Sequence, residues 1–190
     1  MGFYDNSENV DQYIEMCGGY DGSNLYEVLH KNLTDGSSVL ELGSGPGFDI
    51  PFLREHYDVT GSDFSDEFLK RCRKTYPDIS FLKIDASKID VKEKFDCIYS
   101  NKVLHHITEC ELAISLTHQA GKLTENGIIA HSFWIGKENQ EMKGMLFTYY
   151  LPEDLIAIIS ENFQVLTTLS YQEFEDSDSL FVIAKLRKSA

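Results

Sequence analysis

The sequence of 190 residues is poor in basic residues and contains no apolar run that approaches the length of a membrane span. Lysine and arginine total 17 against 31 aspartates and glutamates, which gives a formal net charge of −14. A negative field of this kind repels nucleic-acid phosphates and anionic lipids. We therefore expect neither nucleic acid nor a membrane as a partner, although a local basic patch would be compatible with this balance.

Cysteine is also scarce, with four residues at positions 17, 72, 97 and 110. Their wide spacing, without any Cys-x-x-Cys pair or Cys/His cluster, predicts reduced thiols and no metal site. The first ten residues lack the basic and apolar segments of a secretory signal. Asn6 stands where a myristoylation motif requires Ser or Thr, so we expect an unmodified cytoplasmic protein.

The residues that are present describe a folded α/β chain. Apolar residues make up 42% and aromatic residues 12%, which excludes a largely disordered chain, and the length suits one domain. Strand-like runs alternate with helical segments, in the order SSVLEL, YDVTGSD, ISFLKID, FDCIYSN and GIIAHSFW. This alternation favours a parallel sheet with helices on both faces. We expect residues 1–35 to form a helical cap or lid and residues 36–190 to form the core.

The last third of the sequence departs from this rhythm. After a helical segment at PEDLIAIISENF, two strand-like runs follow closely, FQVLTTLSYQEF and SLFVIAKLRK. A polar turn between them predicts a hairpin, which places an antiparallel strand in the otherwise parallel sheet.

The stretch VLELGSGPGFDI runs from a buried strand into three glycines, Gly43, Gly45 and Gly47. Such a turn can simply pack tightly, or it can let a ligand approach the main chain. A dinucleotide fingerprint would need glycine at Phe48, and the Gly-Lys-Ser/Thr ending of a phosphate-binding loop is absent. Phosphate-binding interpretations are therefore weak.

The same stretch resembles motif I of the class I S-adenosylmethionine-dependent methyltransferases, an acidic residue followed by three alternating glycines, with Glu41 as the acid. The resemblance implies a Rossmann-like sheet of order 3-2-1-4-5-7-6 with strand seven antiparallel, and S-adenosylmethionine as cofactor, S-adenosylhomocysteine being the product. It further implies that Asp63 holds the ribose hydroxyls, Asp85 the adenine amino group and Asn101 the methionine end. The implied cofactor residues are Tyr13, Glu41, Gly43, Ser44, Gly45, Gly47, Asp63, Phe64, Asp85, Ala86 and Asn101.

The implied reaction is methyl transfer by in-line displacement to a small-molecule acceptor. His105 and His106 follow the fourth strand and are candidate bases. In phosphobase N-methyltransferases of this superfamily a polar residue is followed four positions later by a catalytic histidine, which is the spacing of Asn101 and His105, but Asn replaces the acid that would orient the imidazole. Either histidine could instead cap a helix or pack on the sheet. We expect Trp134, Tyr149 and Tyr150 to line the acceptor pocket, unless they belong to the core.

Two other functions stay open from the residues alone. A regulatory module could bind the cofactor without catalysis, and an oxidoreductase could bind a dinucleotide despite the unsuitable glycine register. The acceptor atom, whether oxygen, nitrogen, carbon or sulfur, is left open.

Overall fold

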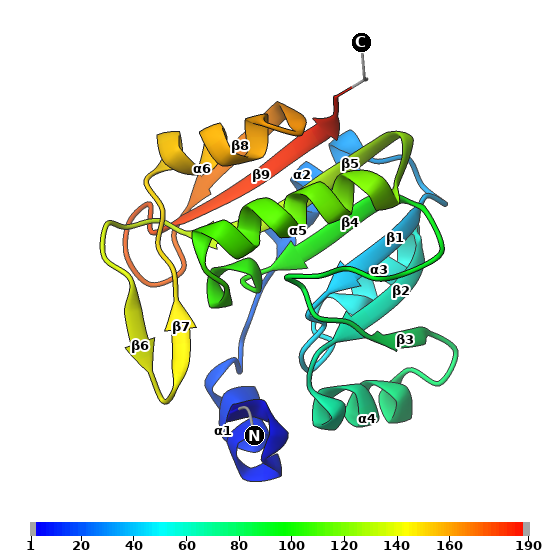
Figure 1. Ribbon diagram of the computed structural model, residues 1–190. Coiled ribbons are helices and arrows are strands. Elements are labelled where there is room, and N and C mark those ends of the chain that lie inside the picture. Colours follow the sequence, from blue (N-terminus) through cyan, green and yellow to red (C-terminus); the bar gives the residue numbers. More distant parts are fainter. Residues whose placement is uncertain (1–2, 188–190) are drawn as a thin grey trace.

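The computed structural model describes residues 3–187, and its centre is a seven-stranded sheet of order β3-β2-β1-β4-β5-β9-β8 (Figure 1). The strands are β1 (Ser38–Leu42), β2 (Asp58–Asp63), β3 (Ser80–Lys83), β4 (Phe95–Asn101), β5 (Leu123–Trp134), β8 (Phe163–Tyr171) and β9 (Ser179–Leu186). The pairings among β1 to β5 are parallel, and β9 runs antiparallel between β5 and β8. The predicted topology, with the seventh strand of the sheet inserted antiparallel, is confirmed.

Helices cover both faces of this sheet. They are α2 (Ser23–Asn32), α3 (Ile50–His56), α4 (Asp66–Thr75), α5 (Glu109–Lys122) and α6 (Pro152–Ser160). Helix α1 (Ser7–Met16) packs instead against α4 and the short turn η1 (Phe3–Asp5), and a second short turn, η2 (Leu104–His106), follows β4. One apolar cluster joins α5 and α6 to the sheet, and a second joins α2, α3 and α4 to the opposite face. In Figure 1, α5 and α6 lie in front of the sheet and α2 lies behind it. None of the helices in the described part of the chain combines the length and apolar character that a membrane crossing requires.

Local signals explain where the helices begin. The Thr108 hydroxyl accepts from the backbone N–H of Glu111, and the Glu111 carboxylate accepts from the backbone N–H of Thr108, which is the capping box of α5. Leu112 and Leu116 are fully buried, as their helical spacing predicts. Ser65 caps α4 by accepting from the N–H of Phe68.

A small hairpin of β6 (Gln140–Met142) and β7 (Met145–Phe147) is absent from the sequence prediction. Its two turn residues, Lys143 and Gly144, have φ of 53° and 73°. Positive φ at both positions is typical of a type I′ turn, for which Asn-Gly is the usual signal. Because Lys143 occupies the position that asparagine usually takes, the sequence lacks the Asn-Gly signal that would have predicted this hairpin.

Candidate functional site

The glycine loop after β1 lies at the carboxyl edge of the sheet, beside the point where the strand order reverses between β1 and β4. Gly43, Gly45 and Gly47 have φ of 65°, 50° and 81°, a region in which side chains are strained. A Cβ added at Gly43 would lie 2.6 Å from Val103, and one at Gly47 would lie 2.8 Å from Tyr76. A Cβ added at Gly45 would meet no atom within 4 Å. Gly45 alone therefore presents bare main chain to open space.

Asp63, at the end of β2, binds this loop directly. Its Oδ2 accepts from the N–H of Gly45 at 2.8 Å, and its Oδ1 accepts from the N–H of Ser65 at 2.8 Å. Burial raises the pKa of the Asp63 carboxyl, and these backbone bonds act in the opposite direction. Phe64 follows with 65% of its surface exposed, and the Lys83 ammonium lies 5.8 Å from its ring centre. A buried carboxylate and an exposed ring thus stand next to the glycine loop.

Asp85 and Ala86 follow β3 at the same edge of the sheet. Asp85 is exposed, and its Oδ1 accepts from the N–H and the hydroxyl of Ser87 at 2.9 and 2.7 Å. These bonds hold the Asp85 side chain in the turn while leaving its second oxygen available.

Two further carboxylates are buried around the loop. Glu41 is 2% exposed, and its Oε2 has no hydrogen-bond partner. Asp49 is 7% exposed and stands at the N-terminus of α3, where its side chain makes no capping bond to the helix. Burial raises the pKa of both carboxyls, and the charge of Asp49 raises that of Glu41 further. Together with Asp63, they form an environment that disfavours anions and favours a cation.

Asp49 is also the centre of a hydrogen-bond network. The hydroxyls of Tyr20 and Tyr26 donate to its Oδ1, the former at 2.9 Å. The Asn101 amide donates to the Tyr20 hydroxyl, and its Oδ1 accepts from Ser132 at 2.6 Å. The end of β4, the segment before α2 and the start of α3 are thereby joined at one point.

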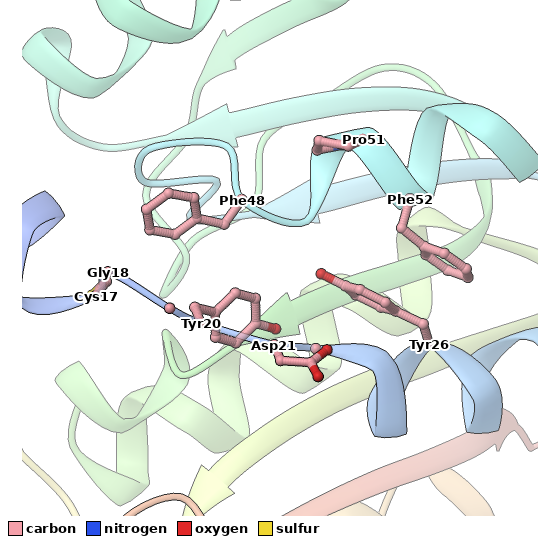
Figure 2. Close-up of a pocket in the computed structure, with 10 residues that line it drawn as sticks. Cys17, Gly18, Tyr20, Asp21, Tyr26, Phe48, Pro51 and Phe52 are labelled. Atoms are coloured by element: carbon pink, nitrogen blue, oxygen red, sulfur yellow. The ribbon is translucent and has the colours of Figure 1, made fainter.

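A cavity of about 310 Å³ lies beside this network, between the segment that joins α1 to α2 and helix α3 (Figure 2). Phe48 stacks on Tyr20 with ring centres 6.1 Å apart, and Tyr26 stacks on Phe52 at 4.2 Å. The sequence analysis missed Tyr20 and Asp49. A signal existed for Tyr20, which is flanked by glycines at positions 18, 19 and 22.

A larger cavity of about 700 Å³ opens at the ends of β4 and β5, enclosed by α1, the β6–β7 hairpin and the loop between β8 and β9. Aromatic side chains dominate its wall: Phe3, Tyr4, Tyr13, Trp134, Phe147, Tyr149 and Phe174. Of the predicted site residues, Tyr13, His105, His106, Trp134 and Tyr149 come together here. Tyr150 is not among the residues that line this cavity, because it is 3% exposed and packs edge-on against Phe133 in the core.

The two histidines of this cavity differ in their surroundings. His105 is 2% exposed, stacks against Phe147 and leaves a buried Nδ1 without a partner. The Nδ1 of His106 lies 2.8 Å from the carbonyl of Leu146 in β7. A carbonyl only accepts, so Nδ1 carries the proton and Nε2 of the neutral ring is the basic nitrogen. Burial lowers the pKa of both imidazoles, most strongly for His105.

Lys102 is a further residue of the cavity wall that the sequence analysis missed. Its φ of 54° is rare for a residue with a side chain. The ammonium lies 3.2 Å from the ring centre of Trp134, donates to Ser179 at 2.7 Å and pairs with Glu173 at 3.3 Å. Burial lowers the pKa of Lys102 to about 8, against the opposing charge of Glu173. The cation is therefore held firmly at the base of the cavity.

Comparison with known sequences bears on what this arrangement does. Residues 39–127 match the model of a family described as a methyltransferase domain. A phosphatidylethanolamine N-methyltransferase of Cereibacter sphaeroides is 31% identical over an alignment of 87 residues, and the match covers 42% of this chain and 43% of that relative. The chain thus matches less than half the length of this curated relative.

The fold is shared with solved methyltransferase structures. The 1,6-didemethyltoxoflavin-N1-methyltransferase of Burkholderia thailandensis, solved with its acceptor and S-adenosylhomocysteine, aligns with a TM-score of 0.80 and 18% identity over 94% of this chain and 83% of that one. The N-methyltransferase NodS of Bradyrhizobium japonicum, solved with S-adenosylhomocysteine, aligns with a TM-score of 0.72 and 16% identity over 94% and 99%. The sequence match and the fold confirm the resemblance to the class I S-adenosylmethionine-dependent methyltransferases.

Proposed function

We propose that the chain is an S-adenosylmethionine-dependent methyltransferase that acts on a nitrogen atom of a small molecule. The observation that carries this proposal is the junction of Gly45 and Asp63, where bare main chain faces open space beside a buried carboxylate. A ligand with a hydroxyl-bearing sugar and a positive charge suits such a place.

The residues around the loop fit this cofactor. Asp63 keeps unused lone pairs that can accept from a ribose diol, and the exposed ring of Phe64 offers a flat apolar surface beside it. The unpartnered Oε2 of Glu41 and the carboxylate of Asp49 favour the sulfonium and ammonium groups. When bound, the cofactor supplies an electrophilic methyl group whose leaving group is a neutral thioether.

A dinucleotide is disfavoured by the charge at the start of α3. In dinucleotide-binding folds the pyrophosphate lies at the N-terminus of the helix that follows the glycine loop. Here Asp49 stands at that N-terminus with a buried carboxyl group. Whenever it is ionised, this carboxylate repels a pyrophosphate.

The larger cavity is the proposed acceptor site, with Tyr13, Trp134 and Tyr149 among the rings that would enclose the acceptor. Nitrogen is the proposed atom because the relatives described above bear the names of N-methyltransferases. An amine must be unprotonated to attack, and the Nε2 of His106 is a basic nitrogen on the cavity wall. General base catalysis of this kind contributes roughly 10²- to 10⁴-fold. We assign His105 a packing role beside it.

Calorimetric titration with S-adenosylmethionine and S-adenosylhomocysteine, with NAD as the control, tests the donor. Binding of the first two alone supports the proposal, whereas binding of NAD alone would refute it. The chain would then be incubated with labelled donor and a panel of primary amines, imidazoles and planar nitrogen heterocycles. Phenols and thiols would be added as oxygen and sulfur acceptors. Labelling of these alone would exclude nitrogen, and donor binding without any turnover would favour a regulatory module.

The role of His106 is tested by the pH dependence of kcat. His106→Gln keeps a polar side chain near the Leu146 carbonyl but lacks a basic nitrogen, so we expect kcat to fall at least tenfold and its acidic limb to disappear. His105→Gln should leave the shape of the profile unchanged. An unchanged profile in the His106 variant would show that another group, or none, takes the proton.

A further inference from the structure

We propose that His30, Asp35 and His56 bind one Zn²⁺ ion, in a site separate from both cavities and independent of the proposed function. The Nδ1 atoms of His30 and His56 each lie 3.4 Å from Oδ1 of Asp35. The three ligand atoms all lie within 4.8 Å of one another. Two imidazoles and one carboxylate therefore converge on a single point.

The distances match a metal better than a set of ion pairs. Charge-assisted hydrogen bonds between nitrogen and carboxylate oxygen are about 2.7–2.9 Å long, shorter than the 3.4 Å found here. Tetrahedral zinc with ligands at about 2.0–2.1 Å separates neighbouring ligand atoms by about 3.4 Å. The third edge, between the two imidazoles, closes by small side-chain rotations, because all three side chains are partly exposed to solvent.

Helical spacing explains why the two histidines face each other. Tyr26 of α2 stacks on Phe52 of α3 with ring centres 4.2 Å apart and planes 7° apart, and Figure 2 shows these two rings on their neighbouring helices. His30 and His56 each follow one of these residues by four positions, which is one helical turn. The next turn of the same helix pair thus sets His30 opposite His56, with ring centres 4.8 Å apart.

A tight turn brings the carboxylate to the histidines. The N–H of Ser37 donates to the carbonyl of Thr34 at 3.2 Å, and Gly36 inside this turn has a φ of 80°. The N–H of Gly36 donates to the carbonyl of His56 at 2.7 Å, which fixes the turn to the end of α3. Asp35 is therefore positioned by backbone bonds and not only by its own side-chain contacts.

The ligand set selects the class of metal. Imidazole nitrogen favours Zn²⁺ and its transition-metal neighbours, whereas Mg²⁺ and Ca²⁺ require oxygen ligands. Three protein ligands with exposed side chains leave a fourth position for water. The sequence analysis predicted no metal site because it considered the scattered cysteines. His30 and Asp35 lie close together in the sequence, but His56 belongs to α3, beyond strand β1, and only the fold brings it to them.

A metal here would act as a clamp between α2 and α3. Helix α2 carries Tyr26, and the Tyr26 hydroxyl donates to Asp49, the N-cap residue of α3. Zinc would therefore hold together the same two helices that carry the hydrogen-bond network of the small cavity.

Calorimetry on the chelator-treated chain of 190 residues tests this proposal, with Zn²⁺ as the titrant and Mg²⁺ as the control. We expect one Zn²⁺ per chain, a rise in Tm on adding zinc, and no effect of Mg²⁺. His56→Gln should weaken zinc binding at least tenfold and abolish the rise in Tm. His118→Gln, which removes a histidine of α5 outside the cluster, should change neither.

Asp35→Asn provides a second variant that keeps the fold, because 64% of this side chain is exposed. It too should weaken zinc binding, and an unchanged Tm without zinc would show that it folds. Absence of zinc binding in the wild type, or equal binding in the His56 and Asp35 variants, would overturn the proposal. Binding of S-adenosylhomocysteine in the same variants reports on the proposed function separately and should persist.

Discussion

Replacement of Gly45 by alanine is the most direct test of the glycine loop, because it separates strain in the chain from obstruction of a ligand. The φ of Gly45 is 50°, and a left-handed conformation costs a residue with a Cβ roughly 1–2 kcal/mol. For a chain of this length, each kcal/mol lowers Tm by about 2–4 °C. We therefore expect Tm to fall by roughly 2–8 °C.

The loss of cofactor binding should be a separate effect. No protein atom lies within 4 Å of the added Cβ, so the methyl group would occupy the space proposed for the cofactor. Forcing one extra methyl group into a packed interface costs about 1–3 kcal/mol, which corresponds to roughly 5- to 150-fold in affinity.

Gly36→Ala is the matched control. Gly36 has a φ of 80°, and a Cβ there would also meet nothing within 4 Å, but its turn lies before β1. The two variants should lose similar stability, measured by thermal unfolding, while calorimetry with S-adenosylhomocysteine should show weaker binding only in Gly45→Ala. Equal affinities in the two folded variants would refute the placement of the cofactor at this loop.

Three other predictions follow from the charges of the site. Asp63→Ala should weaken S-adenosylhomocysteine binding by about 1.5–3 kcal/mol, because hydrogen bonds to a carboxylate are lost. Asp58→Ala, at the exposed start of β2, is the control and should leave binding unchanged. Equal calorimetric titration curves for the two variants would contradict the role of Asp63. Because burial raises the pKa of Glu41 and Asp49, the folded chain keeps these protons to higher pH than the unfolded chain, so the free energy of unfolding should fall as pH rises above about 4. Cationic S-adenosylmethionine should then raise Tm more at about pH 8 than at about pH 6, and thermal unfolding with and without ligand at both pH values checks the sign. Lys102→Met removes a buried cation and leaves Glu173 unpaired, so Tm should fall, and an unchanged Tm in thermal unfolding would show that the pair contributes nothing.

Much of the fold follows from local patterns that the sequence displays directly. Alternation of apolar strands and capped helices predicted the parallel sheet, and the two closing runs predicted its antiparallel strand. These patterns are reliable because burying an apolar face requires a fixed spacing along the chain. The β6–β7 hairpin escaped this reasoning, since its strands are exposed or half-exposed and Lys143 is an unusual turn residue.

The residues of the candidate site likewise fall into those that the sequence predicted and those that it did not. Gly45 and Asp63 were predicted because a motif of fixed spacing joins the ends of neighbouring strands, and the structure places them in direct contact. Asp49 and Lys102 could not be predicted, because their contacts come from distant segments, and for Tyr20 the flanking glycines were the one signal.

The sequence by itself thus determined the succession of strands and helices along the chain, the glycine loop and the excess of negative charge, whereas the strand order within the sheet was implied by the family resemblance. Only the tertiary structure decided which glycine faces open space, which nitrogen of His106 carries the proton, and that His30, Asp35 and His56 meet. The physical reason is the range of the interactions involved. Helix caps, turns and apolar periods act between neighbours in the chain, whereas burial, pKa shifts and ligand geometry depend on side chains that only packing brings together.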